Sequence, residues 1–135
     1  MIDKIKTIAG SNLEKVIQVR RFIHQNPELS FQEFNTSKYI QKFLKEHDIS
    51  YEAGILETGI VAKIEGKNPT DQLIVLRADM DALPIQEEND INYCSINNGI
   101  MHACGHDVHT ASLLGTALIL QEFKDDFSGT IKFIF

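Results

Sequence analysis

The sequence predicts an α/β layered domain in which helices flank a mixed β-sheet. Apolar residues recur at helical spacing in three segments, and short apolar runs bounded by Gly, Pro and Asn lie between them. The resulting order is helix, helix, strand, strand, helix, strand. Residues 73–78 and 130–135 read as strands on either side of a helical crossover, so we expect these two strands to be parallel.

The first two predicted helices each begin at a capping box. Ser11 followed by Glu14 starts the first, which should end near Asn26, before Pro27. Ser30 followed by Glu33 starts the second, whose apolar face continues to about His47. Two amphipathic helices are therefore expected to open the domain.

The sheet and a third helix follow. Residues 60–65 (IVAKIE) have one apolar face, whereas residues 73–78 (LIVLRA) are apolar almost throughout, as expected for a central strand. Residues 107–123 are apolar on almost every side and predict a buried helix, with Asp107 in a capping position. The last strand is predicted over residues 130–135 (TIKFIF).

Composition and charge exclude several classes of protein. With 43% hydrophobic and 24% charged residues, the 135-residue chain has the composition of one ordinary globular domain. The formal net charge of -6 and the scattered distribution of 13 Lys and Arg argue against nucleic-acid binding. No apolar run approaches the roughly 20 residues of a membrane span, and the first residues do not resemble a signal peptide. We therefore predict a cytoplasmic protein with reduced cysteines and a small-molecule or protein partner.

The densest chemical signal is the metal-ligand segment, residues 101–109 (MHACGHDVH). In extended backbone, residues two apart project to the same side, so Cys104 and His106 can reach one ion. Imidazole with thiolate suits zinc best, and cobalt, nickel or manganese less decisively. The start of a helix directly afterwards would stabilise the Cys104 thiolate. The spacing therefore predicts Cys104 and His106 as metal ligands.

A second signal is RADMDALP, residues 77–84, which lies at the carboxyl end of the strand predicted at 73–78. Ligands collect at this end of open α/β sheets. Asp79 or Asp81 is positioned to accept the N–H of a ligating histidine and fix its tautomer. The alternative is that both aspartates only stabilise a turn after the strand.

Other chemistry-bearing residues have a structural interpretation. Cys94 is interpreted as a small buried hydrophobe, and His24 and His47 as surface or packed histidines. The aperiodic stretch 84–101 is too long for a simple turn, and its acidic residues are interpreted as a solvated face.

Three motifs resemble the amidohydrolase branch of the M20 metallopeptidases, which includes hippurate hydrolases, auxin-conjugate hydrolases and N-acetyl-diaminopimelate deacetylases. They are RRFIHQNPELSFQE (20–33), RADMDALPIQEE (77–88) and MHACGHDVHTASLLGTALIL (101–120). The resemblance implies a catalytic domain with two divalent metal ions, zinc most readily and manganese, cobalt or nickel otherwise. It also implies a lid domain through which the parent protein dimerises.

The resemblance assigns roles to individual residues. Cys104 would be the bridging ligand, His106 a terminal ligand and Asp79 the carboxylate that orients the metal centre, while Arg77 stands where other M20 branches have a histidine. The implied reaction is hydrolysis of the amide bond of an N-acyl amino acid by a metal-activated water. A glutamate would act as the general base.

In relatives, the strand that matches GTIKFIF leads into paired glutamates. This sequence ends at Phe135, before that position. We therefore expect residues 1–135 to be the N-terminal part of the catalytic domain, without the lid, and to be inactive alone. The alternative is a non-catalytic metal-binding or interaction fragment that associates through an exposed terminal strand. A redox switch between Cys94 and Cys104 ranks below both, because it lacks the CxxC spacing.

Overall fold

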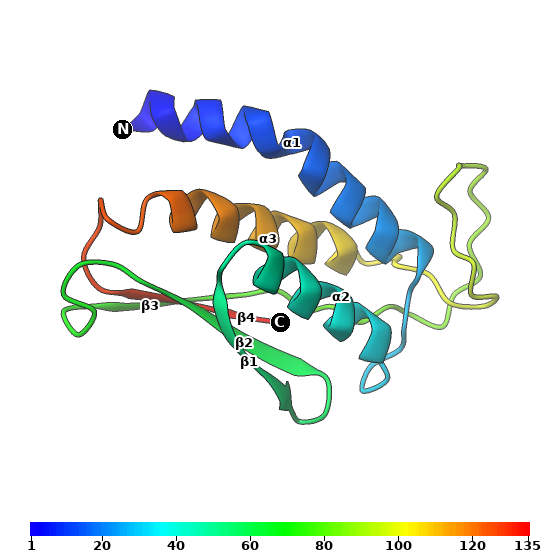
Figure 1. Cartoon of the computed structure of the whole chain (residues 1–135). Helices are drawn as coiled ribbons and strands as arrows, with labels where there is room; N and C mark the ends of the chain where they lie inside the picture. The colour runs from blue at the N-terminus through cyan, green and yellow to red at the C-terminus, as the bar shows by residue number, and fades with distance from the viewer.

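The computed structural model describes all of residues 1–135 as three helices and one four-stranded sheet (Figure 1). The elements in chain order are α1 (Ile2–Gln25), α2 (Phe34–Glu46), β1 (Ser50–Ile55), β2 (Gly59–Glu65), β3 (Leu73–Arg77), α3 (His106–Glu122) and β4 (Thr130–Ile134). The strand order is β1-β2-β4-β3, with β3 parallel to β4 and the other pairs antiparallel. The predicted α/β class, the mixed sheet and the parallel pair are confirmed.

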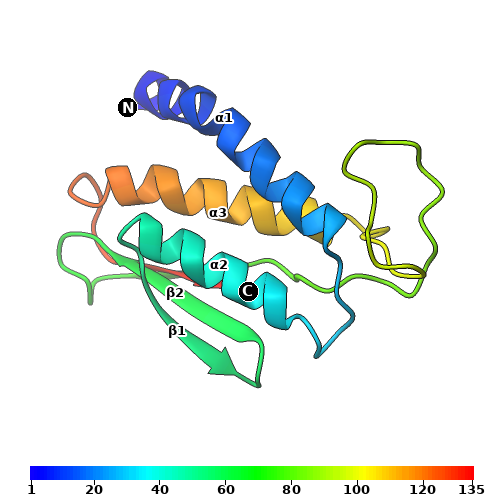
Figure 2. The same ribbon diagram turned by 45° about the vertical axis from the view of Figure 1, so that its right-hand side comes forward.

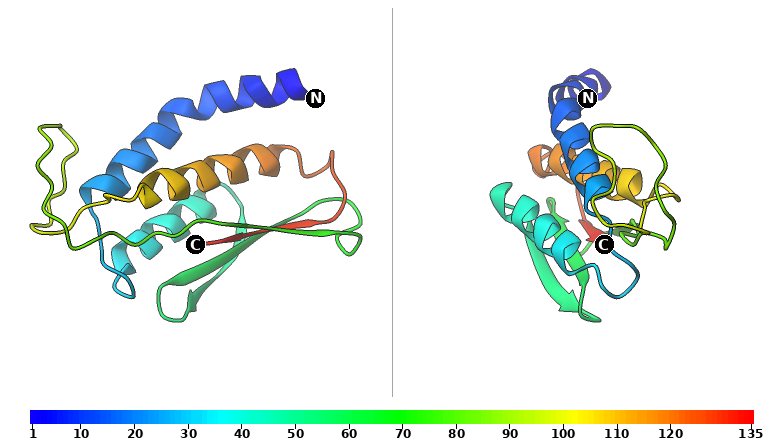
Figure 3. Two further views of the ribbon diagram at one scale, coloured as in Figure 1. Left: turned by 180° about the vertical axis from the view of Figure 1, so that it is seen from behind. Right: turned by 90° about the vertical axis from the view of Figure 1, so that its right-hand side faces the viewer.

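All three helices lie on the same side of the sheet, and α1 packs on the outer side of α3 (Figures 1 and 2). The sheet contributes alternate residues to the core, because neighbouring side chains of a strand point to opposite faces. Ile60, Ala62 and Ile64 of β2 and Ile131 and Phe133 of β4 are all buried. The opposite face of the sheet carries no helix (Figure 3).

The predicted start of the first helix at Ser11 is wrong, because α1 begins at Ile2. Ser11 lies inside the helix, where its hydroxyl donates a hydrogen bond of 2.9 Å to the carbonyl of Ile8. Local hydrogen bonds of this kind let serine occupy a helix interior, so the capping pattern alone does not mark a helix start. Ile8 is itself buried, which shows that packing extends on the N-terminal side of Ser11.

The second capping box does not form either, although α2 begins close to the predicted place. Glu33 occupies the N-cap position without a side-chain cap bond, and the hydroxyl of Ser30 donates to Asp81 at 2.9 Å. The helix is capped instead by the carboxylate of Glu28, which accepts the backbone N–H of Thr36 at 2.8 Å. Both residues of the predicted box therefore serve tertiary contacts.

Two expectations about sheet edges are corrected. β3 was predicted to be central but lies at an edge, and Leu73, Ile74 and Val75 are 58%, 52% and 49% exposed. The last strand was expected to be an exposed edge, but β4 is paired on both sides, with β2 and with β3. An apolar run therefore did not distinguish a central from an edge strand. The other edge, β1, was not predicted, because its sequence SYEAGI has little apolar alternation.

Candidate metal centre

The metal-ligand segment leads directly into α3, whose first residue is His106. Gly105 precedes it with φ 86°, a left-handed conformation that glycine adopts without strain. The carbonyl of Gly105 accepts the backbone N–H groups of Val108 and His109 at 3.0 and 3.1 Å. The Cys104 side chain is exposed beside this first helical turn. The two predicted ligands thus sit at the N-terminus of a well-formed helix.

His106 is oriented by Asp81, which follows β3. Nδ1 of His106 lies 2.9 Å from Oδ1 of Asp81 and 3.1 Å from its backbone oxygen, while Nε2 has no hydrogen-bond partner. Both Asp81 atoms are acceptors, so Nδ1 carries the proton and the lone pair of Nε2 is free. Burial would raise the pKa of Asp81, but hydrogen bonds from Ser30 and His106 lower it below its usual value. This is the arrangement of a metal-ligating histidine held by a carboxylate.

The side chain of Asp79 does not contact His106. Its side chain is 46% exposed and pairs with Arg77, while its backbone oxygen accepts a hydrogen bond of 3.0 Å from Thr110 in α3. Of the two aspartates in the motif, Asp81 and not Asp79 contacts His106. The structure thus assigns the histidine contact, which the motif left open between Asp79 and Asp81, to Asp81. The role of Asp79 in orienting the metal centre stays a prediction.

The donors fit a divalent metal but do not complete a site. Cys104 provides an exposed thiol, and His106 provides a free Nε2. No group of three or more His, Cys, Asp or Glu side chains is arranged to hold a metal ion. Soft thiolate together with imidazole is a donor set that suits zinc. The two predicted ligands are fewer than the three that a catalytic zinc site needs.

Beneath the metal-ligand segment lies a buried polar cluster formed by Arg20, His24, Glu87 and Asp107. Oδ2 of Asp107 accepts from Nε of Arg20 at 2.8 Å and lies 2.8 Å from Nδ1 of His24. Nε2 of His24 lies 3.0 Å from Oε1 of Glu87. Asp107 was predicted to cap α3, but its side chain makes no cap bond and points into this cluster. The cluster joins α1, the loop 84–101 and α3.

The loop 84–101 is not simply a solvated face, because Glu87 is only 6% exposed. Burial would raise the pKa of Glu87, but hydrogen bonds from His24, the backbone N–H of Ser95 and Asn89 lower it to about 2. The backbone N–H of Ile96 also donates to α1, at the carbonyl of Gln25. The loop lies where α1 ends and α3 begins (Figures 1 and 2), so it is anchored against the metal-ligand segment.

Sequence reasoning missed His24 and Glu87 as parts of one cluster. The available signal was local: Arg20 and His24 are four residues apart and therefore share one face of α1. A buried histidine beside an arginine on one helix face calls for carboxylates opposite them. Glu87 carried no comparable signal, because the loop has no periodicity that would distinguish buried Glu87 from exposed Glu88.

Two further chemistry-bearing side chains are those of His102 and Cys94. His102 is 4% exposed, and neither of its ring nitrogens has a hydrogen-bond partner; burial lowers its pKa to about 4. Cys94 is half-buried, and burial together with the neighbouring Glu87 raises the pKa of its thiol. Cys94 and Cys104 are both free thiols.

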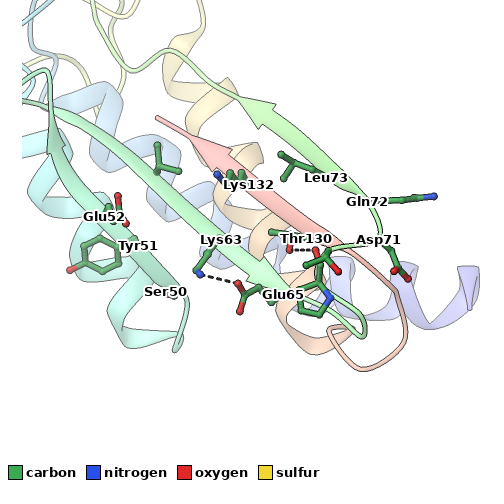
Figure 4. Close-up of a pocket in the computed structure, with 13 residues that line it drawn as sticks. Ser50, Tyr51, Glu52, Lys63, Glu65, Asp71, Gln72, Leu73, Thr130 and Lys132 are labelled. Atoms are coloured by element: carbon green, nitrogen blue, oxygen red, sulfur yellow. Dashed lines mark hydrogen bonds and ion pairs between the residues drawn. The ribbon is translucent and has the colours of Figure 1, made fainter.

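A hollow remote from these residues lies among β1, β2, β4 and the segment before β3. It has a volume of about 650 Å³ and lies on the uncovered face of the sheet (Figure 4). Lys63, Glu65 and Lys132 line it, and Lys63 pairs with Glu65 at 2.9 Å. It contains none of the predicted ligands.

None of the helices is long and apolar enough to cross a membrane.

Residues 75–135, which run from the end of β3 through the metal-ligand segment and α3 to β4, match the model of peptidase family M20/M25/M40. The chain belongs to the M20 family. It is 50% identical over 126 residues to an N-acetyl-L-cysteine deacetylase of Bacillus subtilis, covering 93% of this chain and 30% of that protein. It is 46% identical over 136 residues to thermostable carboxypeptidase 2 of Saccharolobus solfataricus, covering 100% of this chain and 34% of that protein.

A solved structure has the same fold. It is the YXEP protein of Bacillus subtilis, described as a dinuclear metal binding peptidase from the M20 family. The TM-score is 0.85 at 44% identity, over 96% of this chain and 35% of that one. The chain thus spans about a third of the length of the relatives that it matches.

Proposed function

We propose that this chain supplies Cys104 and His106 to a two-metal centre that hydrolyses the amide bond of N-acyl amino acids. The observation that carries the proposal is the pairing of an exposed thiol with an imidazole whose Nδ1 is fixed by Asp81 and whose Nε2 is free. The YXEP protein, a dinuclear metal binding peptidase with the same fold, supports the two-metal part.

The residues of this chain have separate tasks in that centre. Cys104 contributes thiolate sulfur and His106 contributes Nε2, while Asp81 holds the imidazole in the ligating tautomer. When bound, divalent metal ions polarise a carbonyl and lower the pKa of a bound water toward neutrality. Zinc is the metal that this donor pair favours. Asp79 stays a candidate for a further role at the same strand end.

The substrate class follows from what the two relatives have in common. A deacetylase of N-acetyl-L-cysteine releases an amino acid from an acyl group, and a carboxypeptidase releases one from a peptide. In both cases the cleaved bond is an amide whose amine part is an amino acid with a free carboxylate. N-acyl amino acids are the smallest molecules with this feature, so we propose them as the substrate class.

We further propose that the 135 residues alone do not turn over such substrates. They correspond to about a third of the relatives' length and contain two of the ligands. A catalytic zinc site uses three protein ligands and a water. On the relatives' scale, residues 1–135 would be the first part of the catalytic domain.

Cobalt titration tests the ligand assignment. Cobalt(II) bound to thiolate has an ultraviolet charge-transfer band that reports the Cys104 bond directly. We expect the band in the wild-type chain and in Cys94→Ser, which removes the other thiol, and its loss in Cys104→Ser. A band that survives in Cys104→Ser, or is absent from the wild type, would contradict the assignment.

Hydrolysis assays test the rest of the proposal. N-acetyl and N-benzoyl amino acids are incubated with the chain and zinc or manganese, and released amino acid is measured. We expect no turnover by the 135-residue chain and turnover by a protein in which the relatives' remaining length is joined to it. Metal-stimulated turnover by the chain alone would refute the proposed incompetence.

A second candidate function is association through β3, whose edge is unpaired and whose apolar residues are half exposed. Unpaired edges pair readily with other strands. Size-exclusion chromatography separates the candidates, because a strictly monomeric chain argues against association.

A further inference from the structure

The ring of His24 is held between two carboxylates inside the protein. Nδ1 is 2.8 Å from Oδ2 of Asp107 and Nε2 is 3.0 Å from Oε1 of Glu87, with 3% of the side chain exposed. The side chains of Asp107 and Glu87 are each 1% exposed. Water therefore cannot serve as the alternative partner of either ring nitrogen.

Counting protons fixes the form of the ring. An ionised carboxylate only accepts hydrogen bonds, and a neutral imidazole donates from one nitrogen only. With both carboxyl groups ionised, each ring nitrogen of His24 would donate to one of them, which describes an imidazolium. A guanidinium nitrogen of Arg20 also lies 3.4 Å from Nδ1, but the 2.8 Å contact to Asp107 is the shorter and dominates. With Arg20 and His24 positive and Asp107 and Glu87 negative, the cluster is balanced.

The cluster connects directly to the proposed metal ligands. Asp107 is the residue after His106, in the first turn of α3, and its Oδ2 accepts from both Arg20 and His24. Asp107 is completely buried, so this turn cannot shift without breaking charged hydrogen bonds. On the other side, Asp81 holds His106. The segment that carries Cys104 and His106 is therefore fixed between α1 and the end of β3.

We propose that Arg20, His24 and Glu87 are positioning residues that act through Asp107 to fix the metal-ligand segment, with His24 as a buried imidazolium bridging two carboxylates. The part that concerns metal binding rests on the function proposed above. The part that concerns the imidazolium and the order of the first turn of α3 stands on the contacts alone. The two parts are tested separately.

Nitrogen-15 NMR of the histidine rings tests the imidazolium. In the wild-type chain at neutral pH, we expect both ring nitrogens of His24 to carry a hydrogen and to have the shifts of protonated nitrogens. His47, which is half-buried after α2 and has no carboxylate partner, is the internal reference. A bare nitrogen on His24 at neutral pH would overturn this part of the proposal.

Hydrogen exchange tests the positioning. The backbone N–H groups of Val108 and His109 both donate to Gly105 and report on the first turn of α3, whereas that of Ile60, bonded to Phe135, reports on the sheet. In Glu87→Gln we expect exchange at the α3 amides to accelerate at least tenfold more than exchange at Ile60. Glu88→Gln, which changes an exposed glutamate next to it, should leave all three unchanged. Equal acceleration everywhere, or none, would overturn the positioning role.

Metal affinity closes the test. We expect Glu87→Gln and His24→Gln to weaken cobalt binding at Cys104 about tenfold, within the range found when residues supporting a ligand are removed. Glu88→Gln and His47→Gln are the matched controls. Wild-type affinity in both cluster variants would overturn the inference, whereas absence of binding in the wild type would overturn the proposed metal function and leave hydrogen exchange to decide the positioning role. If His24→Gln does not fold, Glu87→Gln carries the comparison.

Discussion

The two sides of the α3 N-terminus differ in what their charged groups leave free. On the α1 side, Arg20, His24, Glu87 and Asp107 are paired with one another, and only Arg20 is appreciably exposed. On the β3 side, the partly exposed carboxylate of Asp81 holds Nδ1 of His106 and leaves its Nε2 without a partner. The first side is suited to hold the backbone and the second to bind a ligand. The residues that hold the backbone of the metal-ligand segment and the residue that orients His106 for a ligand thus come from different elements.

The largest effect is expected from Asp107→Ala. The change leaves the buried charges of Arg20 and His24 without their carboxylate, and breaking a buried pair in this way costs about 3–5 kcal/mol. Asp125→Ala, at an exposed aspartate without a hydrogen-bond partner, should change stability by less than about 0.5 kcal/mol. Chemical denaturation of both variants measures the difference. A small effect of Asp107→Ala would mean that the polar cluster does not hold the α3 N-terminus.

The second effect is a pH dependence caused by Glu87. Its pKa is lowered from 4.5 to about 2 in the folded chain, so the unfolded chain takes up the proton first as the pH falls. The stabilisation is complete above pH 4.5 and is lost between pH 4.5 and about 2, at up to about 1.4 kcal/mol per pH unit for this proton. Glu87→Gln should be less stable at neutral pH and have a flatter profile in this window. Glu88→Gln should keep the wild-type slope, and identical slopes in both variants would rule out Glu87 as the cause.

The sequence predicted the exposed side of this comparison better than the buried side. Spacing singled out Cys104 and His106, and strand pattern singled out the strand end at residues 77–84, because both signals need only local geometry. Metal binding by Cys104 and His106 stays a prediction. His24 and Glu87 were not found, because their contact joins residues 63 positions apart. Only the fold brings such residues together.

The same limit explains the errors in the fold. Periodicity located all three helices and three of the four strands, since each pattern is local. The strand order was not predictable in this way: LIVLR is apolar enough for a central strand, yet β4 takes the central place. Capping boxes failed at both Ser11 and Ser30, because a serine hydroxyl finds other acceptors within a helix or across the fold. Short polar motifs state what a residue can bind but not which partner it meets.

A third prediction concerns Asp81 and Asp79. Asp81→Asn keeps the shape but offers an amide where His106 needs a carboxylate, so we expect metal affinity to fall about 10–100-fold. Asp79→Asn should change affinity less, because its side chain pairs with Arg77 and does not touch His106. Cobalt titration of the two variants compares them at equal side-chain volume. The reverse order would restore Asp79 as the orienting carboxylate.

The smallest effect is expected from Arg77→Ala. The side chains of Arg77 and Asp79 are 71% and 46% exposed, and solvent screening leaves exposed ion pairs with about 0–1 kcal/mol of stabilisation. Denaturation should therefore place Arg77→Ala within about 1 kcal/mol of the wild type, and added salt should reduce even that difference. Exposure alone separates the Arg77–Asp79 pair from the ion pairs of the polar cluster, since its N–O distance is no longer than theirs. A loss comparable to that of Asp107→Ala would show that the β3 side also holds the backbone, and the division between a positioning side and a binding side would fail.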